Sequence, residues 1–68
     1  MLTVNRYAAL VRHRSTLARI VAVLDIDADV LDYDIDDTRG AGVVVWIETV
    51  GDAQAAWVRI VESAALLG

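Results

Sequence analysis

The sequence of 68 residues contains no cysteine and a single histidine. Disulfides and thiolate metal sites are therefore excluded. A chain this short buries only about 60% of the surface that its unfolded form exposes, so its core is only marginally stable without disulfides or metal sites. Burial of apolar surface against another chain is the remaining way to stabilise the core, and a hydrophobic content of 57% favours such an interface. We expect one domain over residues 1–68 that forms a homodimer or a larger oligomer.

Lysine is also absent, and the charged residues that are present separate along the chain. Residues 1–24 carry four arginines and no acid, whereas residues 25–37 carry seven aspartates and no base. Binding to phosphates requires a basic face, so we expect no nucleic-acid partner. A partner of mixed or positive charge fits better, and the two blocks could also complement each other across the twofold axis of a dimer.

Long apolar runs are missing as well. No stretch reaches the length of a membrane span, and the N-terminus has no basic region followed by an apolar run and a small-residue cleavage site. We therefore expect no membrane partner and a cytoplasmic location. The lack of cysteine agrees, because small secreted domains tend to depend on disulfides.

The stretch 17–35 contains neither proline nor glycine, and its hydrophobic period changes from helical to alternating. Apolar residues at helical spacing over residues 17–24 predict a helix that begins after an N-cap at Ser15 or Thr16. The aspartates that follow compete for the backbone and disfavour continuation of this helix. Alternation over residues 30–36 then predicts a strand.

Three further elements complete the predicted order β-α-β-β-α. Residues 4–11 are mostly β-compatible or small and indicate a first strand. Residues 39–42 supply hairpin-turn chemistry with two glycines, and the nearly continuous apolar run 43–50 indicates a central strand. Asp52 is a good N-cap for a second helix, which ends at Gly68, where a glycine cap is expected.

This order predicts an α+β fold, a ferredoxin-like βαββα sandwich. Both helices would cover one face of an antiparallel sheet, the third strand would lie between the first two, and the fourth strand of the fold is missing or vestigial. The first strand is then an open edge.

The alternation of the strands predicts which residues face away from the helices. If the third strand directs Val43, Val45 and Ile47 inward, the residues on its opposite face are Val44, Trp46 and Glu48. If the second strand directs Leu31, Tyr33 and Ile35 inward, the residues on the opposite face are Asp32, Asp34 and Asp36. Trp57, on the second helix, is expected in the core.

An apolar patch around an outward tryptophan usually marks contact with another chain, so we take as candidate interface residues Val44, Trp46, Asp32 and Asp34. Two alternatives stay open. A one-residue change in facing would move Trp46 into the core. The aspartate row could protect an edge strand from aggregation or could dock the arginines of a partner.

Three segments resemble the ACT domain, the small ligand-binding regulatory module of amino-acid metabolism, and in particular the acetolactate synthase small (regulatory) subunit. Residues 15–24, STLARIVAVL, are similar to the GxLxRIxxLF opening of the first ACT helix. Residues 27–31, DADVL, are similar to the RGxNI start of the second strand, and residues 49–52, TVGD, to the junction before the second helix.

The resemblance implies a dimeric regulatory domain that is not itself an enzyme and has no cofactor of its own. It would modulate a larger catalytic subunit of amino-acid biosynthesis, such as acetolactate synthase, when a branched-chain amino acid binds at a subunit interface. The positions that correspond to the effector site are Arg12, Ser15, Thr16, Asp29 and Val30.

Ser15 stands where the effector-binding members have glycine, and its side chain occupies space that the ligand needs. This favours a second hypothesis, a ligand-free protein-interaction or dimerisation module of ferredoxin-like fold. A third hypothesis, a small enzyme of the dimeric ferredoxin-like kind, is disfavoured because the residues form no recognisable acid–base pair. We expect no catalytic residue.

We also expect no metal site. The aspartates at positions 25, 27 and 29 lack the glycine and the bidentate glutamate that a calcium loop requires. His13 lies in a basic, polar segment with no second ligand at a suitable spacing, which indicates an exposed loop residue.

Overall fold

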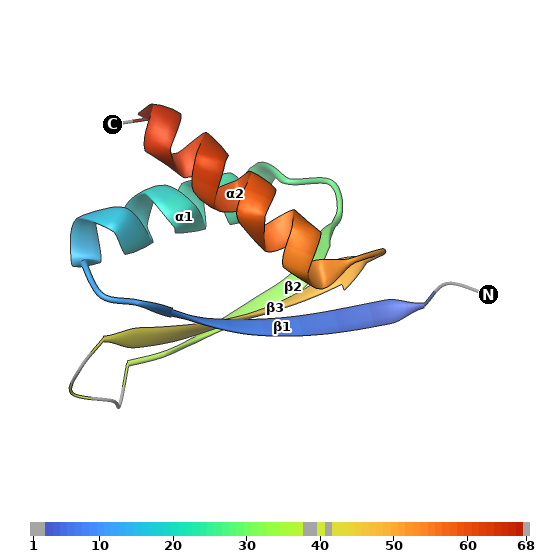
Figure 1. Cartoon of the computed structure of the whole chain (residues 1–68), viewed down its shortest axis with the longest axis horizontal. Coiled ribbons are helices and arrows are strands. Elements are labelled where there is room, and N and C mark those ends of the chain that lie inside the picture. Colours follow the sequence, from blue (N-terminus) through green and yellow to red (C-terminus); the bar gives the residue numbers. More distant parts are fainter. Residues whose placement is uncertain (1–2, 38–39, 41, 68) are drawn as a thin grey trace.

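A computed structural model describes residues 3–37, 40 and 42–67 of the chain. Its elements are β1 (Val4–Val11), α1 (Arg14–Ile26), β2 (Val30–Asp36), β3 (Val43–Val50) and α2 (Ala53–Leu67). The strands form an antiparallel sheet in the order β1-β3-β2. Both helices pack on the same face of this sheet (Figure 1). The predicted α+β fold, a ferredoxin-like βαββα arrangement with its fourth strand vestigial, is therefore confirmed.

The central strand β3 alternates between the two faces of the sheet, as predicted. Val45 and Ile47 are fully buried under the helices, whereas Trp46 between them is half exposed. Ile20 of α1 and Ile60 of α2 pack against the buried pair and are themselves at most 1% exposed. These four branched side chains form the centre of the core.

Helix α2 lies on the sheet through a face of small side chains. Its buried residues recur at the helical spacing i, i+3, i+7 and i+11, namely Ala53, Ala56, Ile60 and Ala64. Alanine lets neighbouring backbones approach closely, because the distance between packed elements depends on the side chains at the contact. Asp52 caps this helix, as predicted, by accepting a hydrogen bond from the Ala55 N–H at 3.1 Å.

The prediction of an N-cap at Ser15 or Thr16 is wrong. The N-cap residue of α1 is His13, whose side chain makes no capping hydrogen bond, so both hydroxyl residues lie inside the first turn. The helix also continues two residues beyond Leu24. It ends at Ile26, and Oδ1 of the C-cap residue Asp27 accepts a hydrogen bond from the Asp29 N–H at 2.9 Å, so an aspartate turn follows the helix.

Leu31 does not point inward, and its side chain is 53% exposed. A β-bulge causes this difference, because Val30 pairs with Thr49 and Asp32 pairs with the adjacent Glu48, which leaves Leu31 without a place in the register. Val30 takes the inner position instead. Beyond the bulge the predicted alternation holds, and the three aspartates of β2 share a face with Trp46.

Gly42 allows the start of β3 to approach β1 closely. Its φ is +154°, and a Cβ built on it would lie 2.8 Å from the backbone oxygen of Val11. Backbone atoms cannot give way as a flexible side chain can, so this position requires glycine. The rest of the predicted 39–42 turn and the predicted Gly68 cap fall largely on residues 39, 41 and 68, which are outside the described residues.

We expect Gly42→Ala to lower the free energy of unfolding by more than about 1 kcal/mol, because the methyl group meets backbone at a positive φ. The matched control is Gly40→Ala, whose added Cβ would have no heavy atom within 4 Å. This control should stay within about 0.5 kcal/mol of the parent. Urea denaturation followed by circular dichroism measures both, and equal effects of the two substitutions would contradict the argument.

Candidate functional site

The face of the sheet opposite the helices has no described element over it. The outward residues of its three strands align in rows across the sheet, because β1 and β2 both pair with β3. The middle row runs from Ala8 through Trp46 to Asp34, and the next runs from Arg6 through Glu48 to Asp32. Trp46, which is 50% exposed, lies at the centre of this open face.

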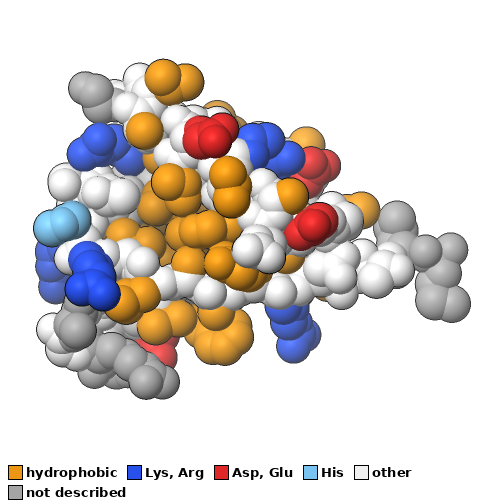
Figure 2. All heavy atoms as spheres, in the orientation of Figure 1, with side chains coloured by type: hydrophobic (Ala, Val, Ile, Leu, Met, Phe, Trp, Pro, Cys, Tyr) orange, Lys and Arg blue, Asp and Glu red, His pale blue; other side chains and the backbone are white. Residues whose placement is uncertain are grey.

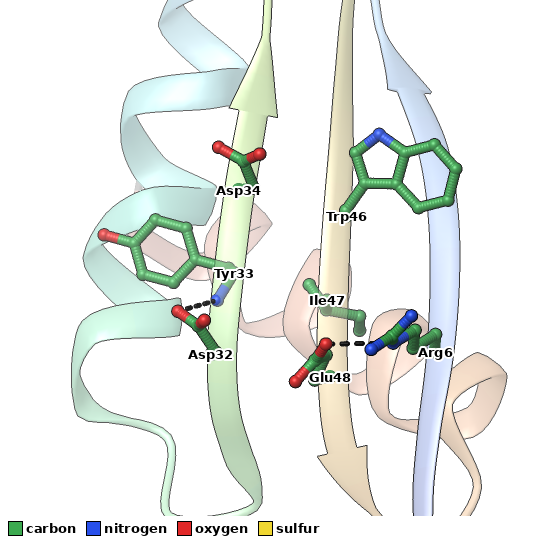
Figure 3. Close-up of a pocket in the computed structure, with 7 residues that line it drawn as sticks. All are labelled: Arg6, Asp32, Tyr33, Asp34, Trp46, Ile47 and Glu48. Carbon is green, nitrogen blue, oxygen red and sulfur yellow. Dashed lines mark hydrogen bonds and ion pairs between the residues drawn. The ribbon is translucent and has the colours of Figure 1, made fainter.

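Figure 3 shows how the side chains of these two rows lie. The Trp46 indole and the Asp34 carboxylate stand on neighbouring strands, and Glu48 points toward Arg6, whose Nε is 2.9 Å from its Oε1. Together with Tyr33 and Ile47 these residues line a shallow hollow of about 350 Å³. All four predicted interface residues, Val44, Trp46, Asp32 and Asp34, therefore lie on one face.

The open face is strongly acidic. The outward residues of its three described strands include four carboxylates, on Asp32, Asp34, Asp36 and Glu48, and one guanidinium, on Arg6, which is a net formal charge of −3 for these residues. Asp32 and Asp34 each accept a hydrogen bond at 2.9 Å from the backbone N–H of the next residue, while both side chains stay exposed. These local bonds hold the two carboxylates in fixed positions above the sheet.

The five candidate effector residues do not meet within one chain. Arg12 follows the last residue of β1, and Ser15 and Thr16 lie in the first turn of α1. Asp29 and Val30 follow the other end of α1, a helix of 13 residues and hence about 20 Å long. A ligand that touched both groups would have to bind between two copies.

Each end of α1 has its own polar surroundings. At its N-terminal end Arg12, His13 and Arg14 border a hollow of about 240 Å³. At its C-terminal end the guanidinium of Arg59 lies 2.8 Å from Asp27 and 3.1 Å from Asp29. The hydrogen bond to Asp27 is the largest cause of a raised pKa of Arg59. The Asp29 carboxylate thus already has a cation in its own chain.

Sequence reasoning missed the Arg59 cluster and one other polar contact. Arg59 is 30 residues from Asp29 and lies on α2, so no local pattern connects them. The Tyr33 hydroxyl donates a hydrogen bond to Asp25 Oδ1 at 2.6 Å. This bond, followed by desolvation and the negative charges of Asp25 and Asp32, raises the pKa of Tyr33.

Among residues 3–37, 40 and 42–67, no group of three or more histidine or acidic side chains could hold a metal ion. Neither described helix is long and apolar enough to cross a membrane. Comparison of the chain with models of protein families, with curated proteins and with solved structures gave no match.

We expect Asp25→Ala to lower the pKa of Tyr33 toward the ordinary tyrosine value of about 10. The pKa of Tyr33 is higher in the folded chain than in the unfolded chain. The contact with Asp25 therefore stabilises the fold fully at pH values below about 10, and this stabilisation is lost as the pH rises through the pKa of the folded state. A Tyr7→Phe background leaves Tyr33 as the one titrating phenol, which is followed by tyrosinate absorbance. Glu62→Ala is the control, and an equal shift in it would show that net charge, not the hydrogen bond, sets this pKa.

Proposed function

We propose that the chain is a cytoplasmic, non-catalytic protein-interaction module in which two copies join along β1 and the open face binds a further polypeptide. The observation that carries this proposal is the unfinished sheet: the described helices cover one face, and β1 has a described strand on one side only. A sheet with a free edge and a bare apolar patch gains stability when another chain covers them.

The flank beside β1 is apolar. Figure 2 shows hydrophobic side chains gathered between the two helices and β1. Trp57 and Val61 of α2 line a groove there with Leu10, and the Trp57 ring lies 6.3 Å from that of Tyr7. Trp57 packs on the core, as predicted, but is only partly buried. A strand added along β1 would cover this flank and satisfy the free backbone groups of the edge.

A second copy suits the β1 edge by charge. Arg6 is the one charged residue of β1, so an antiparallel copy meets no like charge unless the two Arg6 residues pair directly. Arg12 and Arg14 outnumber Asp37 at the hollow beyond one end of β1, whereas Asp52 and Arg6 balance each other at the hollow beside its other end. A twofold axis across β1 places the more basic end of each copy beside the end of the other that holds Asp52.

The open face suits a second copy poorly. Packing two open faces together would oppose a charge of −3 with a charge of −3 in a partly dehydrated interface, where like charges repel strongly. Apolar contacts of Trp46 would have to offset that repulsion. The edge and the face therefore have different partners in this proposal.

Regulation of an amino-acid biosynthetic enzyme by a bound amino acid is the second candidate function, and the basic N-terminus of α1 is the observation that favours it. The N–H groups of the first turn, which have no side-chain cap, lie beside Arg12 and Arg14 and could donate hydrogen bonds to a carboxylate, and Asp37 lines the same hollow. The Arg59 contact weighs against it, because Asp29 is no longer free to hold the ammonium group. The ligand-free module is therefore the better supported of the two.

We expect the protein to sediment as a dimer at micromolar concentration. Val61→Glu, which puts a charge in the β1 flank, should raise the dimer dissociation constant by about tenfold or more, equivalent to about 1.4 kcal/mol. Val58→Glu makes the same change at an exposed position of the same helix outside that groove and should have little effect. A monomer at all concentrations would refute the proposal.

Trp46 reports which surface forms the dimer. In a Trp57→Phe background its emission should keep the wavelength of an exposed indole across the whole concentration range of dimerisation. A blue shift that follows dimerisation would place the open face, and not β1, between the two copies.

We expect no heat in calorimetric titrations with millimolar valine, leucine or isoleucine, because Asp29 is paired with Arg59 and does not bind the ammonium group of the amino acid. Heat that disappears in Arg12→Gln and persists in Arg6→Gln would instead support effector regulation. These two substitutions remove the same charge, one at the N-terminus of α1 and one on the open face.

A further inference from the structure

We infer that the open face binds a segment of a different protein that presents an apolar stripe bordered on one side by arginine or lysine. This inference rests on the proposed function, in which the dimer leaves that face free. It adds the chemistry of the partner, which follows from how apolar and acidic side chains are divided on the face.

The division runs along the strands. In the two rows that contain Trp46 and Val44, the outward residues of β1 and β3 are apolar, namely Ala8, Leu10, Val44 and Trp46. The residues of β2 beside them are Asp34 and Asp36. Neighbouring strands lie about 4.8 Å apart, so one side chain of a partner can touch Trp46 while the next reaches a carboxylate.

Trp46 and Asp34 together suit a guanidinium or ammonium group. The two residues are direct partners in the β2–β3 pairing, and both line the same hollow, with the carboxylate above β2 and the indole leaning toward β1 (Figure 3). A cation within about 6 Å of an indole ring is attracted to its face, and a neighbouring carboxylate adds a charge-assisted hydrogen bond. Arginine fits best, because its planar group can stack on the ring and bind the carboxylate at once.

The adjacent row already contains an ion pair between a guanidinium and a carboxylate. Arg6 reaches from β1 to Glu48 on β3, with 2.9 Å between Nε and Oε1, so Glu48 has a cation from its own chain. The row that holds Trp46 has Ala8 at the equivalent β1 position, which supplies no cation for Asp34. A partner would supply the missing positive charge there.

The same charges argue against other occupants. Nucleic acid and anionic lipid would bring phosphates to a face with a net charge of −3. A second copy would bring the same negative charge. Edge protection needs the aspartates alone and leaves the half-exposed Trp46 unexplained, so the apolar part of the face distinguishes the inference from simple protection of an edge strand.

The test uses the whole chain and three synthetic helical peptides labelled for fluorescence anisotropy. The first has a leucine stripe with arginines along one flank, the second has the same residues in scrambled order, and the third has glutamate in place of arginine. We expect the first peptide to bind at least about tenfold more tightly than the scrambled one, and the glutamate peptide to show no binding.

Single substitutions locate the peptide. Asp34→Asn and Trp46→Ala should each weaken binding of the first peptide by about tenfold, whereas Glu62→Gln, which removes one negative charge from α2, should change it less than about twofold. Equal binding of the scrambled peptide, equal effects of Asp34→Asn and Glu62→Gln, or no binding of the first peptide would each overturn the inference. Sedimentation of the same samples shows separately whether the dimer of the proposed function forms.

Discussion

Burial of one face of β3 is the constraint on which the rest of the structure depends. Val45 and Ile47 can be removed from water only if both helices lie on the same side of the sheet, against Ile20 and Ile60. A central strand must also have a hydrogen-bonded neighbour on each side, which places β1 and β2. The side chains between the buried ones necessarily face the other way, so the order of residues in β3 determines the composition of the open face.

Two helices suffice to cover one face of this sheet and no more. No described element covers the second face, which is open to solvent or to a partner. Three aspartates on the outer side of β2 keep that face hydrated, at the cost of making it repel copies of itself. Charge therefore favours self-association at the β1 edge, and it favours cationic partners on the face.

Residue composition and hydrophobic patterns over several residues predicted the strands and the facing of β3, and the rules for connections between elements predicted the order of the strands. Features decided by one residue or by distant residues were not predictable in this way. The bulge at Leu31 changes the facing of a single residue, and the N-cap at His13 uses no side chain that a capping rule would identify. The Arg59 cluster depends on how α2 crosses the end of α1, which no local pattern encodes.

The geometry of the proposed dimer also bears on effector binding. Antiparallel pairing along β1 would bring Arg12 of one copy to the same end of the joined sheet as Asp29 of the other. The two residues would still be separated by three strand spacings, about 14 Å, because β1 and β3 of the second copy lie between them. The ammonium and carboxylate of an amino acid are attached to one carbon, so the Arg12 and Asp29 side chains would have to cover most of that distance, and Asp29 is already paired with Arg59. A dimer joined at β1 therefore separates the backbones of the two halves of the amino-acid site, so the mode of self-association bears on the choice between the two candidate functions.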